Sequence, residues 1–163
     1  MKAQIKKEQL LAELQEIRNS ILAEASALPV EKRDMVFLGA WSVKDLLAHL
    51  AGWDYTNIEA IRYILVSRLP DFYKHRDPDW QMYNAMLVEK YKRDSFDELL
   101  TLVRTSQPQL IEFLQTIPPE FFNRDFGVRF RGYKVTVQRL LETELEDERV
   151  HCQQIKDFAK EAK

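Results

Sequence analysis

Four long segments of this chain place apolar residues at intervals of three and four, and this spacing narrows the folds available to it more than any other feature. The first segment carries Leu10, Leu14, Ile17, Ile21, Ala25 and Leu28, with glutamates and lysines between them. Such spacing puts the apolar side chains on one face of a helix. Because strand-like alternation is nearly absent, the sequence predicts an all-α fold, a four-helix bundle.

The first two expected helices are bounded by residues that break or cap helices. The first ends before Pro29. The second follows Ser42, which resembles a capping box with Asp45, and runs from residue 43 to about Leu69, just before Pro70. Both helices are long enough to span a bundle.

The other two expected helices start at Ser95 and Thr136, residues that cap helices well. Pro108 lies inside the third pattern, where proline removes a backbone donor and clashes with the preceding turn. We therefore expect a kink between Arg104 and Pro108, or two helices. The fourth helix should extend to about Lys160.

The connection between the second and third helices covers residues 70–94, which is about 25 residues and far more than antiparallel neighbours need. It allows these two helices to run parallel. Residues 79–93 within it could form a short extra helix, and residues 124–135 read as a loop or small hairpin. We expect one domain over residues 1–163.

Composition excludes several classes of function. The net charge of -2 and the pI near 6.0 provide no basic surface for nucleic acid, and the four glycines never cluster as in a phosphate-binding loop. No apolar stretch has membrane-spanning length, and the N-terminal residues show no apolar run. The single cysteine, Cys152, cannot form an intramolecular disulfide and is expected to be a small buried residue. We expect a cytoplasmic protein without nucleic-acid or membrane partners.

The stretch TELEDERVHCQQI, residues 143–155, breaks the apolar pattern of the last helix. Glu144, Glu148 and His151 fall on the stripe that should be buried, and Asp147 lies one turn before His151. A carboxylate and an imidazole on adjacent turns can reach one cation. The alternative is that these charges simply face water, as most acidic residues on helices do.

His49 lies on the flank of the buried stripe of the second helix. Alone, such a histidine is more often a hydrogen-bonded core residue than a ligand. It lies roughly 10 Å from the start of its helix, and His151 lies roughly 13 Å from the end of the last helix. The two imidazoles reach the same level only if these helices are antiparallel neighbours. His75, in the polar connection, reads as a surface residue.

Three stretches carry a resemblance to a known family: WSVKDLLAHLAGWD, SFDELLTLVRTSQPQLIEFLQTIPPEFF and VTVQRLLETELEDERVHCQQI. They resemble the DinB-like superfamily, and WQMYNAMLVEKYKRDSFDELL is similar to its DfsB and ClbS branch. The resemblance implies up-down-down-up helix order and a divalent metal bound by three histidines. His49 and His151 match two of them, and Asp147 stands where the third would be.

Two imidazoles and one carboxylate suit Zn, Ni, Fe or Mn and leave positions for water or substrate. The metal site implied by the resemblance is therefore His49, Asp147 and His151, with Glu144 and Glu148 as reserve ligands or general bases. The alternative is that Asp147 marks a site that has lost its metal.

The resemblance also implies a function, since the superfamily includes metal-dependent enzymes that use low-molecular-weight thiols and a ClbS-like protein that detoxifies a reactive metabolite. We expect a transferase or hydrolase acting on a small electrophilic substrate, with a stress or detoxification role. The pocket should be lined by residues of three segments, namely Trp53, Asp54, Asn57, Ser106 and Gln107, with Trp80 and Tyr83 as a cover.

The alternative function is a non-catalytic bundle without metal, either a ligand binder or a scaffold that forms a homodimer. Exposed side chains at Glu144 and Glu148, with no pocket beside His49, would favour this alternative.

Overall fold

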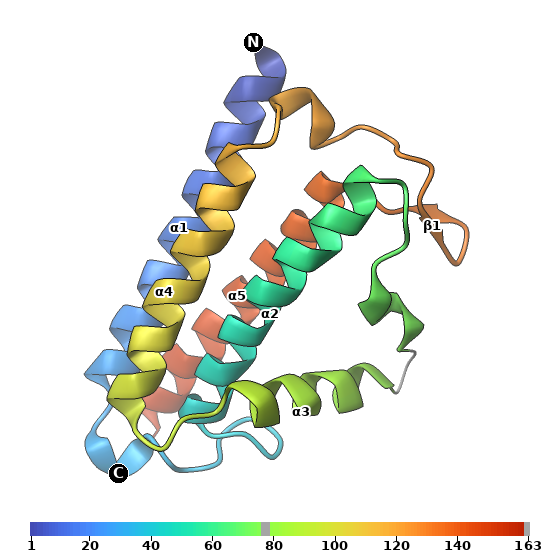
Figure 1. The fold of residues 1–163 in the computed structure, drawn as a ribbon. Coiled ribbons are helices and arrows are strands. Elements are labelled where there is room, and N and C mark those ends of the chain that lie inside the picture. Colours follow the sequence, from blue (N-terminus) through green and yellow to red (C-terminus); the bar gives the residue numbers. More distant parts are fainter. Residues whose placement is uncertain (76–78, 162–163) are drawn as a thin grey trace.

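The computed structural model describes residues 1–75 and 79–161, which form four long helices, a fifth helix beside them and a two-stranded hairpin (Figure 1). The bundle helices are α1 (Lys2–Ala27), α2 (Val43–Leu65), α4 (Phe96–Gln115) and α5 (Val137–Lys160). The smaller elements are α3 (Asp79–Tyr91), β1 (Arg129–Phe130), β2 (Tyr133–Lys134) and the short 3-10 helices η1 (Val30–Lys32), η2 (Asp71–Lys74) and η3 (Pro119–Phe121). The expected all-α bundle with an extra helix is confirmed.

The helices run in up-down-down-up order. In Figure 1, α1 and α5 run toward the end that carries the C-terminus, while α2 and α4 run away from it. Helix α1 packs on α5, and α2 packs on both α4 and α3. Helices α2 and α4 are therefore parallel, as the long connection allows, and α2 and α5 are antiparallel.

The starts of the helices match the capping residues of the sequence. The hydroxyl of Ser42 accepts the backbone N–H of Asp45, whose carboxylate accepts the backbone N–H of Ser42, so the predicted capping box is present. The hydroxyls of Ser95 and Thr136 accept backbone N–H groups of Glu98 and Arg139. These bonds satisfy donors that the first turn of a helix leaves without partners.

Helix α2 ends at Leu65, four residues before the predicted end at Leu69. Ser67 has a positive φ of 62°, and its N–H bonds to the carbonyl of Ile64. The N–H of Arg68 bonds to the carbonyl of Tyr63. These two bonds are those of a Schellman motif, which usually needs glycine at the left-handed position. A serine there gave no stop signal in the sequence.

Helix α4 continues through Pro108, so the alternative of two helices is wrong. Pro108 lies on the solvent-exposed side of the helix, as does Arg104, whose carbonyl loses its intrahelical partner at this position. Water can satisfy that carbonyl, which lowers the cost of an interior proline. The helix can therefore keep its apolar face on the bundle.

The interior contains two apolar clusters separated by a polar layer. One cluster includes Leu14, Ile61 and Leu141, and the other includes Ile21 and Ile155. Buried polar side chains lie between them in the sequence of every bundle helix: Arg18, Asp54, Asn57, Ser106, Gln107 and Glu148. A band of polar groups therefore crosses the middle of the bundle.

Helix α3 approaches α2 closely at Gly52. A Cβ atom on Gly52 would lie 2.9 Å from Cβ of Leu87 and 3.1 Å from the ring of Tyr91. One turn earlier on α3, the side chain of Asn84 accepts a hydrogen bond from the indole N–H of Trp53 (2.8 Å). Glycine thus allows the contact that sets α3 beside the neighbouring cavity.

None of the helices formed by the described residues combines the length and apolar character that a membrane crossing requires.

Candidate functional site

A cavity of about 540 Å³ opens between α2, α3, α5 and the hairpin. Its walls are largely aromatic, contributed by Trp41, Trp53, Phe72, Tyr73, Trp80 and Tyr133. Its polar lining includes His49, Asn57, Glu144, Asp147 and His151. The chain has three tryptophans, and all of them line this cavity. An apolar cavity of this size with a few convergent polar groups is typical of a small-molecule site.

The two histidines meet in this cavity. The ring centroids of His49 and His151 lie 5.4 Å apart and the rings are nearly perpendicular. This arrangement follows from the antiparallel packing of α2 and α5, so the expectation that both imidazoles reach one level is confirmed. His75 does not line the cavity and instead packs on the ring of Tyr83.

Each imidazole has a different hydrogen-bonding environment. His49 is buried, and its Nδ1 atom has no hydrogen-bond partner among the described residues. Nδ1 of His151 lies 2.8 Å from Oε1 of Gln154, which accepts hydrogen bonds, so the neutral ring that fits this contact carries its proton on Nδ1 and a lone pair on Nε2. A buried polar atom without a partner is uncommon in a native structure and indicates a missing ligand, ion or water.

Burial lowers the pKa of His49 to about 3, with smaller contributions in the same direction from His151 and Arg18. Each cause disfavours a second positive charge in the interior. His49 is therefore a neutral imidazole at ordinary pH, the form that binds metals and accepts protons.

Two carboxyl groups of α5 line the same cavity. Burial raises the pKa of Glu144 well above its usual value, and the nearby carboxyls of Glu148 and Asp54 raise it further. Glu144 makes no side-chain hydrogen bond or ion pair with any residue that the structure describes. Asp147 lies at the edge of the cavity, where partial burial raises its pKa and the adjacent His151 lowers it.

The three residues of the expected metal site all line the cavity, but only the two imidazoles are in mutual contact. Within residues 1–75 and 79–161, no three His, Cys, Asp or Glu side chains are grouped closely enough to bind a metal ion. Asp147 therefore does not share a common centre with His49 and His151 in this conformation.

The polar layer beneath the cavity is organised by Arg18, a residue that the sequence reading did not single out. Its guanidinium donates two hydrogen bonds to the carboxylate of Asp54, at 2.8 and 2.9 Å, and a third to Glu148. Ser106 donates to the same Asp54 carboxylate at 2.5 Å. Each of the four bundle helices thus contributes one side chain to this hydrogen-bonded group of Arg18, Asp54, Ser106 and Glu148, called the Arg18 layer below.

Charge balance in this layer involves one guanidinium and several carboxyls. Burial opposes the charge of Arg18, but Asp54 and Glu148 outweigh it and raise the pKa of the guanidinium. Burial raises the pKa of Glu148, although Arg18 acts against this shift. Oε2 of Glu148 has no hydrogen-bond partner within the described part of the chain.

Several residues expected around the site lie outside the cavity lining. Asp54, Ser106 and Glu148 belong to the Arg18 layer, which makes Glu148 a partner of Arg18. Gln107 donates to the backbone carbonyl of Leu14 (2.9 Å). Tyr83 hydrogen-bonds Thr56 (3.0 Å) and lines a separate, smaller cavity. Trp53, Asn57 and Trp80 do line the main cavity.

The cavity also brings together residues that no helical pattern in the sequence indicates. Trp41 precedes the cap of α2, and Tyr73 lies in η2, so neither belongs to a helical stripe. Tyr133 comes from the hairpin. Arg18 did carry a signal, because it follows Leu14 by four residues and precedes Ile21 by three, on the buried stripe of α1.

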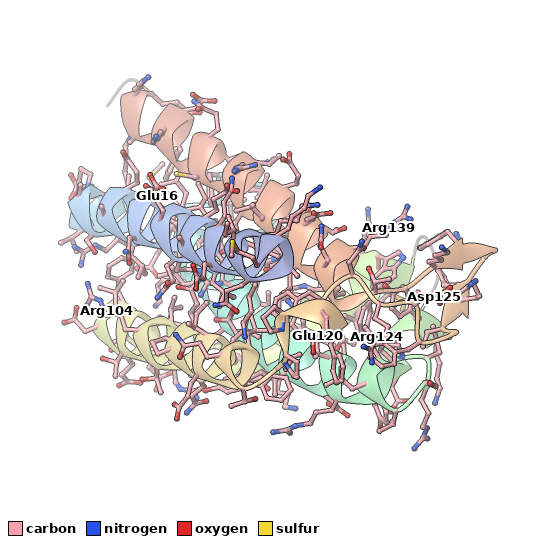
Figure 2. The ribbon with its side chains drawn as sticks, turned by 90° about the horizontal axis from the view of Figure 1, so that it is seen from above. Glu16, Arg104, Glu120, Arg124, Asp125 and Arg139 are labelled. Atoms are coloured by element: carbon pink, nitrogen blue, oxygen red, sulfur yellow. The ribbon has the colours of Figure 1, made fainter. Side chains whose placement is uncertain are left out.

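The mouth of the cavity carries positive charge. Lys134 and Arg139 line it, and the guanidinium of Arg139 lies over the ring of Tyr133, 4.8 Å from its centroid. Lys134 pairs loosely with Asp125, at 3.9 Å. In Figure 2, Arg139 and Asp125 lie at the hairpin end of the bundle, away from Glu16 and Arg104. The mouth of the cavity is thus basic at Lys134 and Arg139, while its interior carries Glu144 and the two imidazoles.

Comparisons with known proteins agree with this fold. The sequence pattern of the DinB superfamily matches residues 13–155. A crystal structure of an uncharacterised protein from Escherichia coli UTI89 is similar, with a TM-score of 0.74 and 16% sequence identity over 94% of this chain and 92% of that one. At this identity the likeness concerns the fold alone. No curated protein matches the sequence significantly.

Proposed function

This chain belongs to the DinB superfamily, and we propose that its cavity binds a small organic molecule and converts it with a divalent metal ion bound by His49, Asp147 and His151. The observation that carries the proposal is the buried Nδ1 atom of His49, which has no partner among the described residues although the ring faces His151 across 5.4 Å. Unprotonated imidazole nitrogens are the commonest protein ligands of such metals.

The donor set suits Zn, Ni, Fe or Mn, since these metals accept imidazole and carboxylate together. Asp147 has to rotate toward the two imidazoles on binding, because it does not share their centre in the described conformation. Its position at the open edge of the cavity leaves room for this change. A bound metal of this kind lowers the pKa of a coordinated water or thiol and so supplies a nucleophile at neutral pH.

The chain's own residues would position the substrate. The aromatic walls would exclude water from an apolar substrate body. Glu144, whose pKa is raised by burial, would act as an acid toward a substrate oxygen. These properties suit the transfer of a low-molecular-weight thiol, or of water, to a small electrophile. Such a detoxification reaction also fits the resemblance of residues 80–100 to the DfsB and ClbS branch.

Metal titration of purified protein tests the proposal. Isothermal titration calorimetry with Zn²⁺, Ni²⁺ and Mn²⁺ should show one site per chain, weakened more than about 100-fold in His49→Ala and His151→Ala, because a lost ligand costs more than a lost outer partner. His75→Ala is the matched control, since His75 lies outside the cavity, and it should bind as the wild type does. Equal affinity in all four proteins would contradict the metal site.

The second candidate is a ligand-binding protein that works without metal. The observation that favours it is the cavity itself, whose aromatic walls can bind a ligand by apolar contact alone. Ligand binding that survives exhaustive treatment with a chelator, with no metal uptake, would identify this function. A scaffold without any pocket is disfavoured, because Glu144 and Glu148 are buried and the cavity includes His49.

A further inference from the structure

Asn57 is a buried polar residue of the cavity whose side-chain amide is unpaired at both ends among the described residues. Its side chain lines the cavity and is only 1% exposed. Neither Nδ2 nor Oδ1 has a hydrogen-bond partner among the described residues. A buried amide loses the hydrogen bonds that it makes with water in the unfolded chain, so an amide left unpaired at both ends destabilises the fold.

The surroundings of Asn57 do not explain it as a packing residue. It lies in the polar layer, yet Arg18, Asp54 and Ser106 bond to one another and not to it. The other asparagine of the cavity, Asn84, differs in this respect, because its Oδ1 accepts the indole N–H of Trp53. Asn84 therefore fixes the position of α3, while Asn57 keeps a donor and an acceptor available to the cavity.

The side-chain amide of asparagine offers a donor and an acceptor side by side. A ligand that carries the same pair can form two antiparallel hydrogen bonds with it, as two amides do. Carboxamides, lactams and ureas have this pair. A site built to hydrogen-bond a ligand discriminates strongly against analogues without the group, because its own buried polar atoms are then left unpaired.

The aromatic walls of the cavity indicate the chemistry of the rest of the ligand. Trp53 lies one turn before Asn57 on α2, and its ring contacts those of Phe72 (5.3 Å) and Trp80 (6.3 Å between centroids). Such surfaces favour flat aromatic groups, which stack face-to-edge or offset against them.

We propose that Asn57 is the recognition group of this cavity and that its ligands are aromatic molecules bearing a carboxamide, lactam or urea group. The inference rests on the proposed function, since it names the class of molecule that the same site takes.

A matched pair of probes tests this inference. Benzamide and acetophenone differ only in the replacement of an amide NH₂ by a methyl group, so they compare a donor–acceptor pair with an acceptor alone. Because all three tryptophans line the cavity, the indole N–H signals in ¹H–¹⁵N NMR spectra report occupancy directly. We expect wild-type protein to bind benzamide at least about tenfold more tightly than acetophenone.

Variants then assign this preference to Asn57. In Asn57→Leu, which replaces the amide by an apolar group of similar size, the two probes should bind equally. In Asn57→Asp, which keeps an oxygen acceptor for the NH₂ group of benzamide, the preference for benzamide should persist. Asn19→Leu, on the exposed face of α1, is the control and should keep the preference. Circular dichroism and the dispersion of the indole signals verify that each variant is folded.

The outcomes separate this inference from the proposed function. Equal binding of both probes to the wild type, or an unchanged preference in Asn57→Leu, overturns the role of Asn57 while the small-molecule site stands; a water held by Asn57 alone would give this result. No shift of any indole signal with either probe at millimolar concentration contradicts the site and the inference together. Metal titration of the His49 and His151 variants tests the metal site separately, because it depends neither on Asn57 nor on the two organic probes.

Discussion

The guanidinium of Arg18 on α1 forms two parallel hydrogen bonds with the carboxylate of Asp54 on α2, in a layer where each side chain is 1% exposed. Removing Asp54 deprives the buried guanidinium of two of its three hydrogen bonds to carboxylates and leaves Ser106 without this acceptor. We therefore expect Asp54→Ala to lower the free energy of unfolding by roughly 3–5 kcal/mol, measured by urea denaturation. Asp34→Ala breaks the exposed pair with Lys44 and should cost less than about 1 kcal/mol. Similar losses of unfolding free energy in Asp54→Ala and Asp34→Ala would contradict a special role for the buried pair.

Removing every charge of the layer should be less harmful than removing one. Replacing Arg18, Asp54 and Glu148 together by Met, Leu and Leu leaves no unpaired buried charge among the three. Since apolar replacement of buried ion pairs is often neutral, this triple variant should recover most of the stability lost in Asp54→Ala. A triple variant less stable than Asp54→Ala would show that the layer contributes net stability.

Stability of the metal-free protein should depend on pH through His49. The pKa of His49 is about 3 in the folded protein, against 6.5 in the unfolded chain, so between these values only the unfolded chain binds the proton. The free energy of unfolding should therefore fall as the pH drops from 6.5 toward 3, by roughly 1.4 kcal/mol per pH unit from this group. Urea denaturation of wild type and His49→Leu measures the difference in slope. An NMR titration in which His49 protonates near pH 6.5 would refute it.

The end of α2 offers a substitution that should stabilise the protein. Ser67 occupies the left-handed position of a Schellman motif, with φ 62°, a conformation that is strained for any residue with a Cβ atom. Ser67→Gly should raise the free energy of unfolding by about 0.5–1 kcal/mol, as measured by chemical denaturation. Val66→Gly, one residue earlier at φ -108°, should instead be destabilising. If both substitutions changed the free energy of unfolding in the same direction, the Schellman motif could not be the cause.

Gly52 should tolerate no side chain. In Gly52→Ala the added Cβ meets Cβ of Leu87 at 2.9 Å, so α3 has to shift. Overpacking of this kind costs about 1–3 kcal/mol, which should exceed the roughly 1 kcal/mol that alanine adds to helix propensity. The NMR signal of the Trp53 indole, which donates to Asn84, should move with α3. The control is Glu59→Ala, at an exposed position of the same helix. It should leave the free energy of unfolding, measured by urea denaturation, and the Trp53 indole signal nearly unchanged.

The helices could be predicted because their apolar spacing and their capping residues are local in sequence. Ser42 and Thr136 cap the helices that their positions indicated. The end of α2 could not be predicted, since the left-handed turn at Ser67 depends on two backbone bonds and not on a glycine.

The proximity of the two imidazoles could be predicted because helix order alone determines it. His49 and His151 meet because antiparallel helices bring equal heights together. Asp54 and Ser106 were expected to line the pocket. In the structure Asp54 instead binds Arg18 of a third helix and accepts a hydrogen bond from Ser106, and the sequence alone did not indicate this role for Arg18. Which polar residue faces a cavity and which faces an ion pair depends on contacts between helices that spacing along one helix does not determine.

The hairpin that supplies Tyr133 and Lys134 to the cavity consists of two strands of two residues each, and both of these side chains are exposed to solvent. It contributes to the mouth of the cavity and does not belong to the Arg18 layer. Substitutions in this hairpin can therefore alter which molecules enter while the helices keep their packing. A cavity built in this way can change the molecules that it admits through a few substitutions at its mouth, while the packing of the helices stays the same.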